Sequence, residues 1–549
     1  MHSFAALLYN GAELNVVPNR FGSESDLFFK FNLSPRQQIF FRSRLALWDC
    51  PCTVVFVDVE GSAGMRQQNF QFVFPVPEHQ QAGADSTSRR FRGFVAASEV
   101  HCHTFIHYKN LNLAWRQKQV EKDCAMSKQA ASSKRNLVRR FFSLLGPGLI
   151  TGAADDDPSG IATYSIAGAQ MGTAMLWTAF ITWPFMACVQ FMCARIGMVT
   201  GMGLGDALRR KGPRWLLFGG ALGLLAANTI NVGSDLSGMA DAAEMLSGIN
   251  SHIYVVIFGI GIACATIRFR YHQIAMIMKW LAAVLFAYVI TAFIAGPDWG
   301  RVLRDTFIPS LPKGHAGWEN LVAILGTTIS PYLFFWQASE EVEEEKAMGR
   351  RLLRQRQGAT KWEIIDRKID VGVGTFFSNF VMYFIILTTA LTLHKKGISN
   401  VETSKQVAEA LRPLAGTFAY LLYTVGIIGV GFLAIPTLAG SAAYAFAETF
   451  SWKEGLDEPF RGAIPFYAVL IFSILVGIAM DFLQINPIKA LFWTAIINGV
   501  LAPFLLVGVL IAASDRKLMQ GQPSSWLSRI AVAIITMVMF GAAAAMFIL

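Results

Sequence analysis

The run Asp155-Asp156-Asp157-Pro158-Ser159-Gly160 lies inside an apolar segment, residues 144–167, that is long enough to cross a membrane. One aspartate at the centre of a bilayer costs about 2.5–3.5 kcal/mol even by the lower estimates, so these side chains must face water, a cation or hydrogen-bond donors. Pro158 has no backbone N–H and Gly160 adopts conformations closed to other residues, so the helix is expected to open here. The run therefore predicts a polar site within a broken membrane helix.

The composition also indicates a membrane protein. Of the 549 residues 54% are hydrophobic and only 15% are charged, whereas a soluble protein usually carries about 25% charged residues. From Leu144 onward the apolar residues form blocks of about 17–25 residues, which suits a hydrocarbon core of about 30 Å. The sequence predicts an all-α membrane protein with eleven spans, at residues 144–167, 172–199, 215–246, 252–267, 273–295, 319–339, 370–393, 415–447, 464–480, 488–512 and 528–548.

The formal net charge of +10 is explained by cytoplasmic loops, where Lys and Arg of membrane proteins collect. Alternate loops, at 209–214, 268–270, 346–368 and 516–517, hold more Lys and Arg than the loops between them. We therefore expect a protein of the cell (inner) membrane with a cytoplasmic N-terminus and, after an odd number of spans, an outside C-terminus. No basic segment is interleaved with aromatic residues, so no nucleic-acid partner is expected.

Residues 1–125 differ from the rest of the chain because they show no sustained helical or alternating periodicity. We expect a poorly structured N-terminal extension there. A basic leader at 126–143 begins with Met126, which suggests the hypothesis that Met126 is the natural initiator and that 1–125 is not native. The seven cysteines do not have the spacing of a disulfide framework.

A second break is expected in span six, at Thr327-Thr328-Ile329-Ser330-Pro331. This span opens a set of five spans at 319–512, as the first broken span opens the set at 144–295, and the helix at 528–548 lies outside both sets. After five spans the second set enters from the opposite side of the membrane. Two helices interrupted at corresponding positions indicate an inverted-repeat transporter whose binding site lies near the membrane midplane.

The two breaks together form a candidate metal site. A carboxylate combined with free carbonyls and hydroxyls is the oxygen-rich environment that hard cations prefer. The alternative is a proline kink whose aspartates face a wet vestibule, and for Asp155 and Asp156 the two explanations are equally good. The predicted metal-site residues are Asp157, Gly160, Thr327 and Ser330, with Pro158 and Pro331 at the helix breaks.

Other polar residues in the spans are candidates for an ion path. Asp235, on a similar face of span three to Asn228, is either a second acidic group on the path or a buried partner to a helix end. Asn498 either reaches the site or bonds a neighbouring helix. The acidic run at 340–345 is interpreted as a solvated helix face rather than a cation-gathering exit. The path candidates are Asp156, Asn228, Asp235, Tyr332 and Asn498.

Several short motifs stand out in the first two spans and just after them: Gly146-Pro147-Gly148, Asp157-Pro158, Ala167-Gly168-Ala169-Gln170 with Gly172, Ala194-Arg195-Ile196-Gly197, and Thr200-Gly201. Together they resemble the opening of the NRAMP family of divalent-metal transporters. The resemblance covers residues 140–549. It implies the LeuT-type fold and a metal site built from spans one and six.

The departures from the family pattern concern the site itself. Where the family reads Asp-Pro-Gly-Asn, this chain has Asp157-Pro158-Ser159-Gly160, and where it reads Met-Pro-His, this chain has Ser330-Pro331-Tyr332. Two acidic positions of the family's span three are Asn228 and Gly238 here. With these changes the chain resembles the NRAMP-related magnesium transporters. An oxygen-only, roomy site suits Mg²⁺, which dehydrates reluctantly and keeps several waters.

We therefore expect a secondary transporter that moves Mg²⁺ and Mn²⁺ into the cytoplasm by alternating access, without proton coupling. One alternative is a proton-coupled Mn²⁺/Fe²⁺ symporter of the ordinary NRAMP type. Another is an amino-acid or organic-cation transporter of the same fold, although adjacent aspartates oppose a bound carboxylate. No nucleophile–base set or phosphate loop suggests an enzyme. The expected partners are divalent metal ions and the lipid bilayer, with neither a cofactor nor a protein partner.

Overall fold

The computed structural model describes five strands within residues 14–75, residue 152, and residues 154–548 except 213, 270–282, 313, 457 and 484. The chain forms two compact units, Met1–Arg140 and Phe141–Leu549. The described part of the first unit is an antiparallel sheet in the order β1-β2-β3-β4-β5. Its strands are β1 (Leu14–Pro18), β2 (Asp26–Ser34), β3 (Gln37–Leu45), β4 (Cys52–Glu60) and β5 (Asn69–Pro75).

These strands differ from the expectation of a poorly structured segment. Each strand pairs with the next one along the chain, and the pairing of β2 with β3 has one irregularity, between Asn32 and Ser34. The basic leader at 126–143 and most of the N-terminal half of span one lie outside the described residues. The hypothesis that Met126 is the natural initiator stays a prediction.

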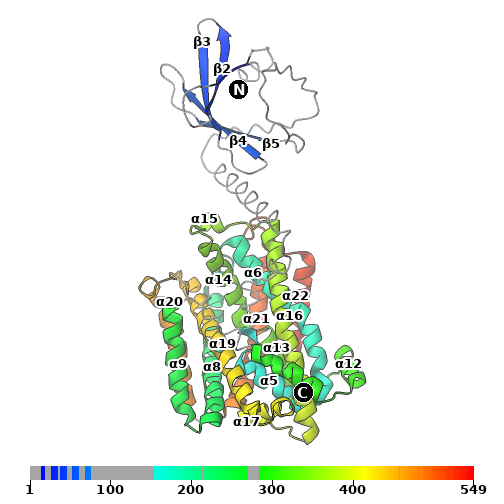
Figure 1. The fold of residues 1–549 in the computed structure, drawn as a ribbon. Coiled ribbons are helices and arrows are strands. Elements are labelled where there is room, and N and C mark those ends of the chain that lie inside the picture. Colours follow the sequence, from blue (N-terminus) through cyan, green and yellow to red (C-terminus); the bar gives the residue numbers. More distant parts are fainter. Residues whose placement is uncertain are drawn as a thin grey trace. The chain divides into compact units, whose positions relative to one another are not determined.

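The described part of the second unit is helical (Figure 1). Its main helices are α5 (Pro158–Met171), α6 (Leu176–Thr200), α8 (Arg214–Ser247), α9 (Ser251–Arg268), α11 (Phe286–Ile294), α13 (Gly314–Thr328), α14 (Pro331–Ala347), α16 (Lys361–Thr392), α19 (Ala419–Phe450), α20 (Ile464–Asp481), α21 (Pro487–Ser514) and α22 (Trp526–Ile548). Short helices connect them: α7 (Leu204–Arg209), α12 (Trp299–Phe307), α15 (Leu353–Arg356), α17 (Ser404–Glu409) and α18 (Arg412–Ala415). Single 3₁₀ turns complete the set: η2 (Gly172–Met175), η3 (Ala283–Leu285), η4 (His394–Lys396), η5 (Gly416–Phe418) and η6 (Phe460–Gly462).

The membrane spans follow the sequence prediction closely. Nine stretches of the described chain are long and apolar enough to cross a membrane, and one of them, Pro158–Thr200, contains the second predicted span and the C-terminal part of the first. The fifth predicted span, 273–295, lies partly outside the described residues, and its described part contains α11. The prediction of an all-α membrane unit is confirmed.

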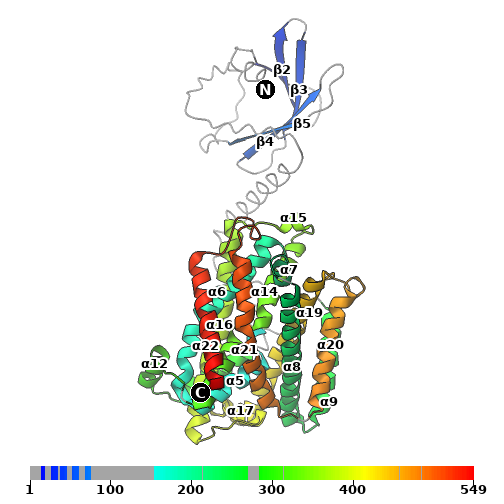
Figure 2. The same cartoon turned by 180° about the vertical axis from the view of Figure 1, so that it is seen from behind.

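The connecting segments separate into two groups at opposite ends of the helical unit (Figures 1 and 2). α12, α17 and the C-terminus lie at one end, and α7 and α15 lie at the other. The loops predicted to be cytoplasmic include α7 and α15, whereas α12 and α17 belong to loops predicted to be outside. The alternation of loops therefore agrees with the chain crossing the membrane at each predicted span.

Close backbone contacts hold the helix of the second break in place. α13 packs against α21, where a Cβ added at Gly326 would lie only 2.1 Å from the Ala495 carbonyl oxygen. A Cβ added at Gly499 would lie 2.3 Å from the Val322 carbonyl oxygen. Small residues that let backbones approach in this way are typical of helix packing in membranes.

The outer helices present apolar faces. On α9, Val255, Gly259 and Ile262 are buried, whereas isoleucines on the other side of the same helix are exposed. A helix that is apolar on both its buried and its exposed face is expected where the exposed face meets lipid. The exposed isoleucines of α9 are Ile253, Ile257, Ile260 and Ile267.

Candidate metal site at the two helix breaks

The first break is the N-terminus of α5. Asp157 is the N-cap residue with extended backbone (φ −68°, ψ 170°), and its Oδ1 accepts a hydrogen bond from the Gly160 backbone nitrogen at 2.6 Å. Pro158 occupies the first helical position, where a missing N–H carries no penalty. The sequence folds this way because Asp is a favoured N-cap and Pro a favoured first residue. Asp157 therefore has a fixed backbone position and one carboxylate oxygen held by its own helix.

The second break separates α13 from α14. α13 ends at Thr328, and Pro331 is the first residue of α14. Ser330 Oγ donates to the Thr327 carbonyl oxygen at 2.6 Å and lies 3.0 Å from the Gly326 carbonyl oxygen. The serine hydroxyl thus satisfies carbonyls at the end of α13, which have no partner within the helix.

The two breaks lie against each other. A Cβ added at Gly160 would lie 3.1 Å from Thr327 Oγ1 and 3.4 Å from Asp157 Oδ1. Tyr332 Oη donates to the Ala154 carbonyl oxygen at 3.1 Å, which links α14 to the segment just before the first break. The structure therefore brings together the four residues predicted as the metal site, all of them buried: Asp157, Gly160, Thr327 and Ser330.

α8 supplies a residue that the sequence reasoning missed. Asn231 Nδ2 donates to Asp157 Oδ2 at 3.0 Å, so both carboxylate oxygens of Asp157 are held. Asp235, one helical turn further on, is fully buried and interacts electrostatically with Asp157. The available signal was the four-residue spacing of Asn231 and Asp235, which places both on one face of α8.

Asp155 and Asp156 face a different helix. Ser378 Oγ, on α16, donates to Asp155 Oδ2 at 2.7 Å and lies 3.3 Å from Asp156 Oδ1. Both aspartates are buried, so neither is in an open vestibule in this conformation. The three consecutive carboxylates therefore have different partners, with Asp157 alone bonded to α8.

The remaining path candidates lie on helices beside the site. Asn228 Nδ2 donates to the Leu438 carbonyl oxygen and to Ser441 Oγ, both at 2.9 Å, so this residue links α8 to α19. Asn498 is buried on α21, next to Gly499 at the α13 contact. No hydrogen bond in the described part of the chain joins either asparagine to Asp157.

The possible metal ligands at the breaks are oxygen atoms. They belong to one carboxylate, two hydroxyls, an amide and backbone carbonyls. Among the described residues, no group of three or more His, Cys, Asp or Glu side chains is arranged to hold a metal ion. A cation at the breaks would therefore be bound by few carboxylates and by neutral oxygens, which suits a hard ion that keeps part of its hydration shell. Soft metals would find no sulfur ligand in this set.

The acidic run at 340–345 corrects one prediction. We expected a solvated helix face, but Glu341, Glu343 and Glu345 are buried on α14. Arg367 of α16 binds Glu341 at 2.8 Å and also pairs with Glu344. The pattern of charges along residues 340–345 could not show that these glutamates are buried, because the arginine that pairs with them lies on another helix.

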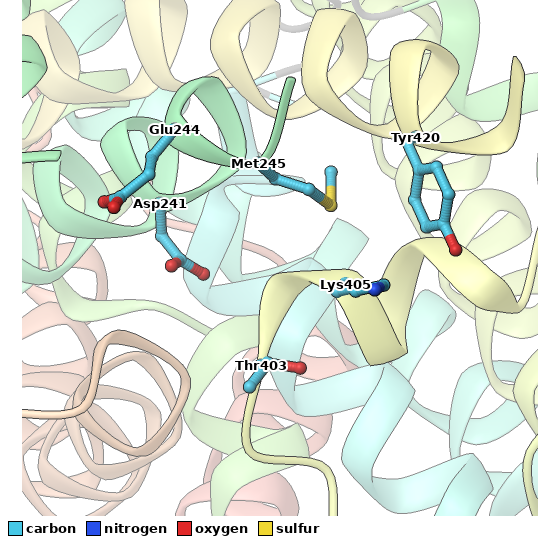
Figure 3. A pocket seen from close by; sticks show the side chains of 6 residues that line it. All are labelled: Asp241, Glu244, Met245, Thr403, Lys405 and Tyr420. Atoms are coloured by element: carbon cyan, nitrogen blue, oxygen red, sulfur yellow. The ribbon is translucent and has the colours of Figure 1, made fainter. Parts of the chain in front are cut away.

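A separate pocket of about 420 Å³ lies near the C-terminal end of α8 (Figure 3). Its two carboxylates already accept hydrogen bonds from backbone nitrogens. Asp241 accepts one from Ser404 N at 3.3 Å, and Glu244 accepts one from Ser251 N at 2.8 Å. Asp241 is ten residues beyond Asn231, or about 15 Å along the helix. The pocket is therefore distinct from the breaks, and its lining residues are Asp241, Glu244, Met245, Thr403, Lys405 and Tyr420.

Two broken helices that each open a set of five spans, followed by an extra helix, define a multi-pass membrane transporter of the LeuT type. The description of the matching family is "Natural resistance-associated macrophage protein-like" (Nramp), and the match extends over residues 148–549. The chain belongs to this family.

Relatives and solved structures agree with that assignment. A "Divalent metal cation transporter MntH" from Caldanaerobacter subterraneus subsp. tengcongensis is 26% identical over 426 residues, which are 73% of this chain and 93% of the relative. The Yersinia pestis protein of the same name is 27% identical over 320 residues, covering 56% of this chain and 74% of the relative. The crystal structure of the Eremococcus coleocola manganese transporter, in complex with an aromatic bis-isothiourea compound, has a TM-score of 0.60. That likeness has 15% identity and covers 75% of this chain and 88% of the other.

Proposed function

We propose that this chain carries divalent metal ions across the membrane by alternating access, with Mg²⁺ and Mn²⁺ as the ions and the cytoplasm as the destination. The observation that carries the proposal is the contact between the two helix breaks, with the Asp157 carboxylate at its centre. Relatives named as divalent metal cation transporters support a divalent metal cation as the substrate. The membrane is the cell (inner) membrane, with the N-terminus cytoplasmic and the C-terminus outside.

The preference for hard ions rests on the chemistry of the donors. Ser330 precedes the proline of the second break and offers a hydroxyl rather than a thioether. Mg²⁺ and Mn²⁺ accept carboxylate, carbonyl and water ligands, whereas thioether ligands favour softer metals. Both ions fit a site with one close carboxylate and neutral oxygens.

Transport without proton coupling is supported by the residue after the second proline. Tyr332 occupies the position after Pro331, and its hydroxyl donates to a backbone carbonyl across the breaks. A tyrosine that keeps its proton cannot relay protons near neutral pH as a histidine can. The second candidate function is a proton-coupled Mn²⁺/Fe²⁺ symporter, and the observation that favours it is the buried acid Asp235 beside the site.

Uptake of Mn²⁺ and Mg²⁺ into proteoliposomes tests the proposal. The purified chain is expected to take up both ions down their gradients, and Asp157→Ala should abolish uptake because the carboxylate held by Gly160 and Asn231 at the first break is lost. Asp298→Ala is the matched control, since Asp298 is the N-cap of the loop helix α12, which belongs to neither helix break. Undiminished uptake by Asp157→Ala would remove Asp157 from the site.

A further inference from the structure

The two polar atoms of the Asn231 side chain differ in their hydrogen bonding. Its amide nitrogen is bonded to Asp157 Oδ2, whereas its amide oxygen makes no hydrogen bond within the described part of the chain, although the residue is fully buried. Buried polar atoms are almost always partnered, so an oxygen of this kind needs an explanation. We propose that the Asn231 side-chain oxygen is a ligand of the transported divalent cation, beside Asp157; the proposal rests on the function proposed above.

The geometry orients this oxygen. Because the carboxylate of Asp157 only accepts hydrogen bonds, the NH₂ group of Asn231 must face it and the amide oxygen must lie on the other branch of the same planar group. The contact therefore fixes the amide oxygen within a few ångströms of the Asp157 carboxylate. An amide oxygen held in this way is prepared to bind a cation without further rearrangement.

Position 160 supplies no side-chain oxygen to the site. Gly160 has no side chain, and only 3.1 Å separates its missing Cβ from Thr327 Oγ1. Asp157 Oδ1 already accepts from the Gly160 nitrogen. A hard divalent ion takes about six oxygen ligands, so one carboxylate and two hydroxyls leave several positions to fill. An amide from α8 fills one of them without adding charge.

A second buried acceptor group lies on the same face of α8. The Asp235 carboxylate, four residues after Asn231, is fully buried and interacts with the Asp157 carboxylate and the Ser159 backbone. Asn231 and Asp235 thus place an amide oxygen and a second carboxylate next to Asp157. Buried charges are paired or coordinate metals, so this grouping is the pattern expected of a cation-binding surface.

A simpler role for Asn231 is to position Asp157 by hydrogen bonding alone. The two roles predict opposite orders for two variants of similar or smaller size. If the oxygen binds the cation, Asn231→Asp keeps a ligand oxygen, whereas Asn231→Ala removes it. If the NH₂ group only holds Asp157, Asn231→Asp is the worse variant, because it sets a second carboxylate against the first.

The experiment measures the half-saturating metal concentration for Mn²⁺ and Mg²⁺ uptake in proteoliposomes, and the rise in melting temperature that each metal causes in detergent. Asn231→Ala is expected to raise the half-saturating concentration about tenfold and to reduce the metal-induced stabilisation, with a smaller effect on the maximal rate. Asn231→Asp is expected to stay within about threefold of the parent or to bind more tightly. Asn231→Ser is the second truncation if the alanine variant does not fold.

Asn320→Ala is the matched control. Asn320 is also a fully buried asparagine with an unpartnered oxygen, but its nitrogen donates to Gln170 Oε1 at 2.7 Å, two turns before the second break. Its metal affinity should equal that of the parent. Wild-type affinity in Asn231→Ala, or weaker binding by Asn231→Asp than by Asn231→Ala, would overturn the proposal. Failure of the parent chain to transport any divalent metal would instead refute the proposed function.

Discussion

Ser330 illustrates how one residue would set the chemistry of the proposed metal site. Its hydroxyl donates to carbonyls at the end of α13, and its oxygen still has lone pairs for a cation. The backbone position is fixed by Pro331, which starts α14. A substitution at position 330 therefore changes a side chain that lies at the second break.

Substituting Ser330→Met should shift the metal preference toward softer ions. The ratio of Cd²⁺ to Mg²⁺ uptake at equal concentrations is expected to rise by about tenfold, the effect of about 1.4 kcal/mol in relative affinity. Ser330→Ala is the control, because it removes the hydroxyl without adding sulfur. An unchanged ratio in Ser330→Met would mean that position 330 does not contact the ion.

The sequence predicted the position of some residues at the breaks but not the residues that contact them from other helices. The Asp157-Pro158 pair is a local helix-start signal, so its position could be predicted without knowing the fold. The contact of Asn231 with Asp157 joins residues 74 positions apart, and no local pattern specifies which face of α8 meets α5. Ser378 was missed for the same reason, since it reaches Asp155 from α16.

The packing of α13 decides where the second break lies. Gly326 and Gly499 allow the backbones of α13 and α21 to touch, and Thr327 follows Gly326 directly. A side chain at either glycine would force the two helices apart. The position of Thr327 relative to α5 therefore depends on glycines outside the proposed metal site.

Gly326→Ala should lower both stability and uptake. Its Cβ would meet the Ala495 carbonyl oxygen at 2.1 Å, and overpacking of this kind costs about 1–3 kcal/mol or more. A thermal unfolding scan in detergent should show a lower melting temperature. Gly372→Ala is the control, since a Cβ there meets nothing within 4 Å and alanine favours a helix. Equal melting temperatures for the two variants would contradict the tight contact.

Hydropathy and proline positions predicted the elements well, because lipid imposes long apolar segments and a break needs a local cause. The ion pairs of Arg367 with Glu341 and Glu344 were not predicted, since the partners lie on different helices. The strands at 14–75 were not expected either. Their pairing depends on contacts between neighbouring strands rather than on a clear alternation in the sequence.

For the whole molecule, the arrangement of loops predicts which surfaces face each side of the membrane. Leu311, after α12, and Leu352, before α15, are both highly exposed and belong to loops at opposite ends of the helical unit. The excess of Lys and Arg predicts that the second loop lies in the cytoplasm.

Cysteine labelling should confirm this orientation. In intact cells a membrane-impermeant thiol reagent is expected to label Leu311→Cys above the level of the parent chain, which has its own cysteines. Leu352→Cys should become labelled only after the membrane is opened. The reverse pattern would show that the chain is inserted the other way round and that the proposed direction of uptake is wrong.

The central claim is that an oxygen-only site at two helix breaks carries hard divalent ions without protons. Proteoliposomes that contain a Mg²⁺ indicator and a pH indicator measure both fluxes in one sample. We predict that external Mg²⁺ raises the lumenal Mg²⁺ signal, with no acidification beyond that of protein-free liposomes. Mn²⁺ uptake without Mg²⁺ uptake, or acidification that accompanies metal entry, would contradict the account and favour a proton-coupled symporter.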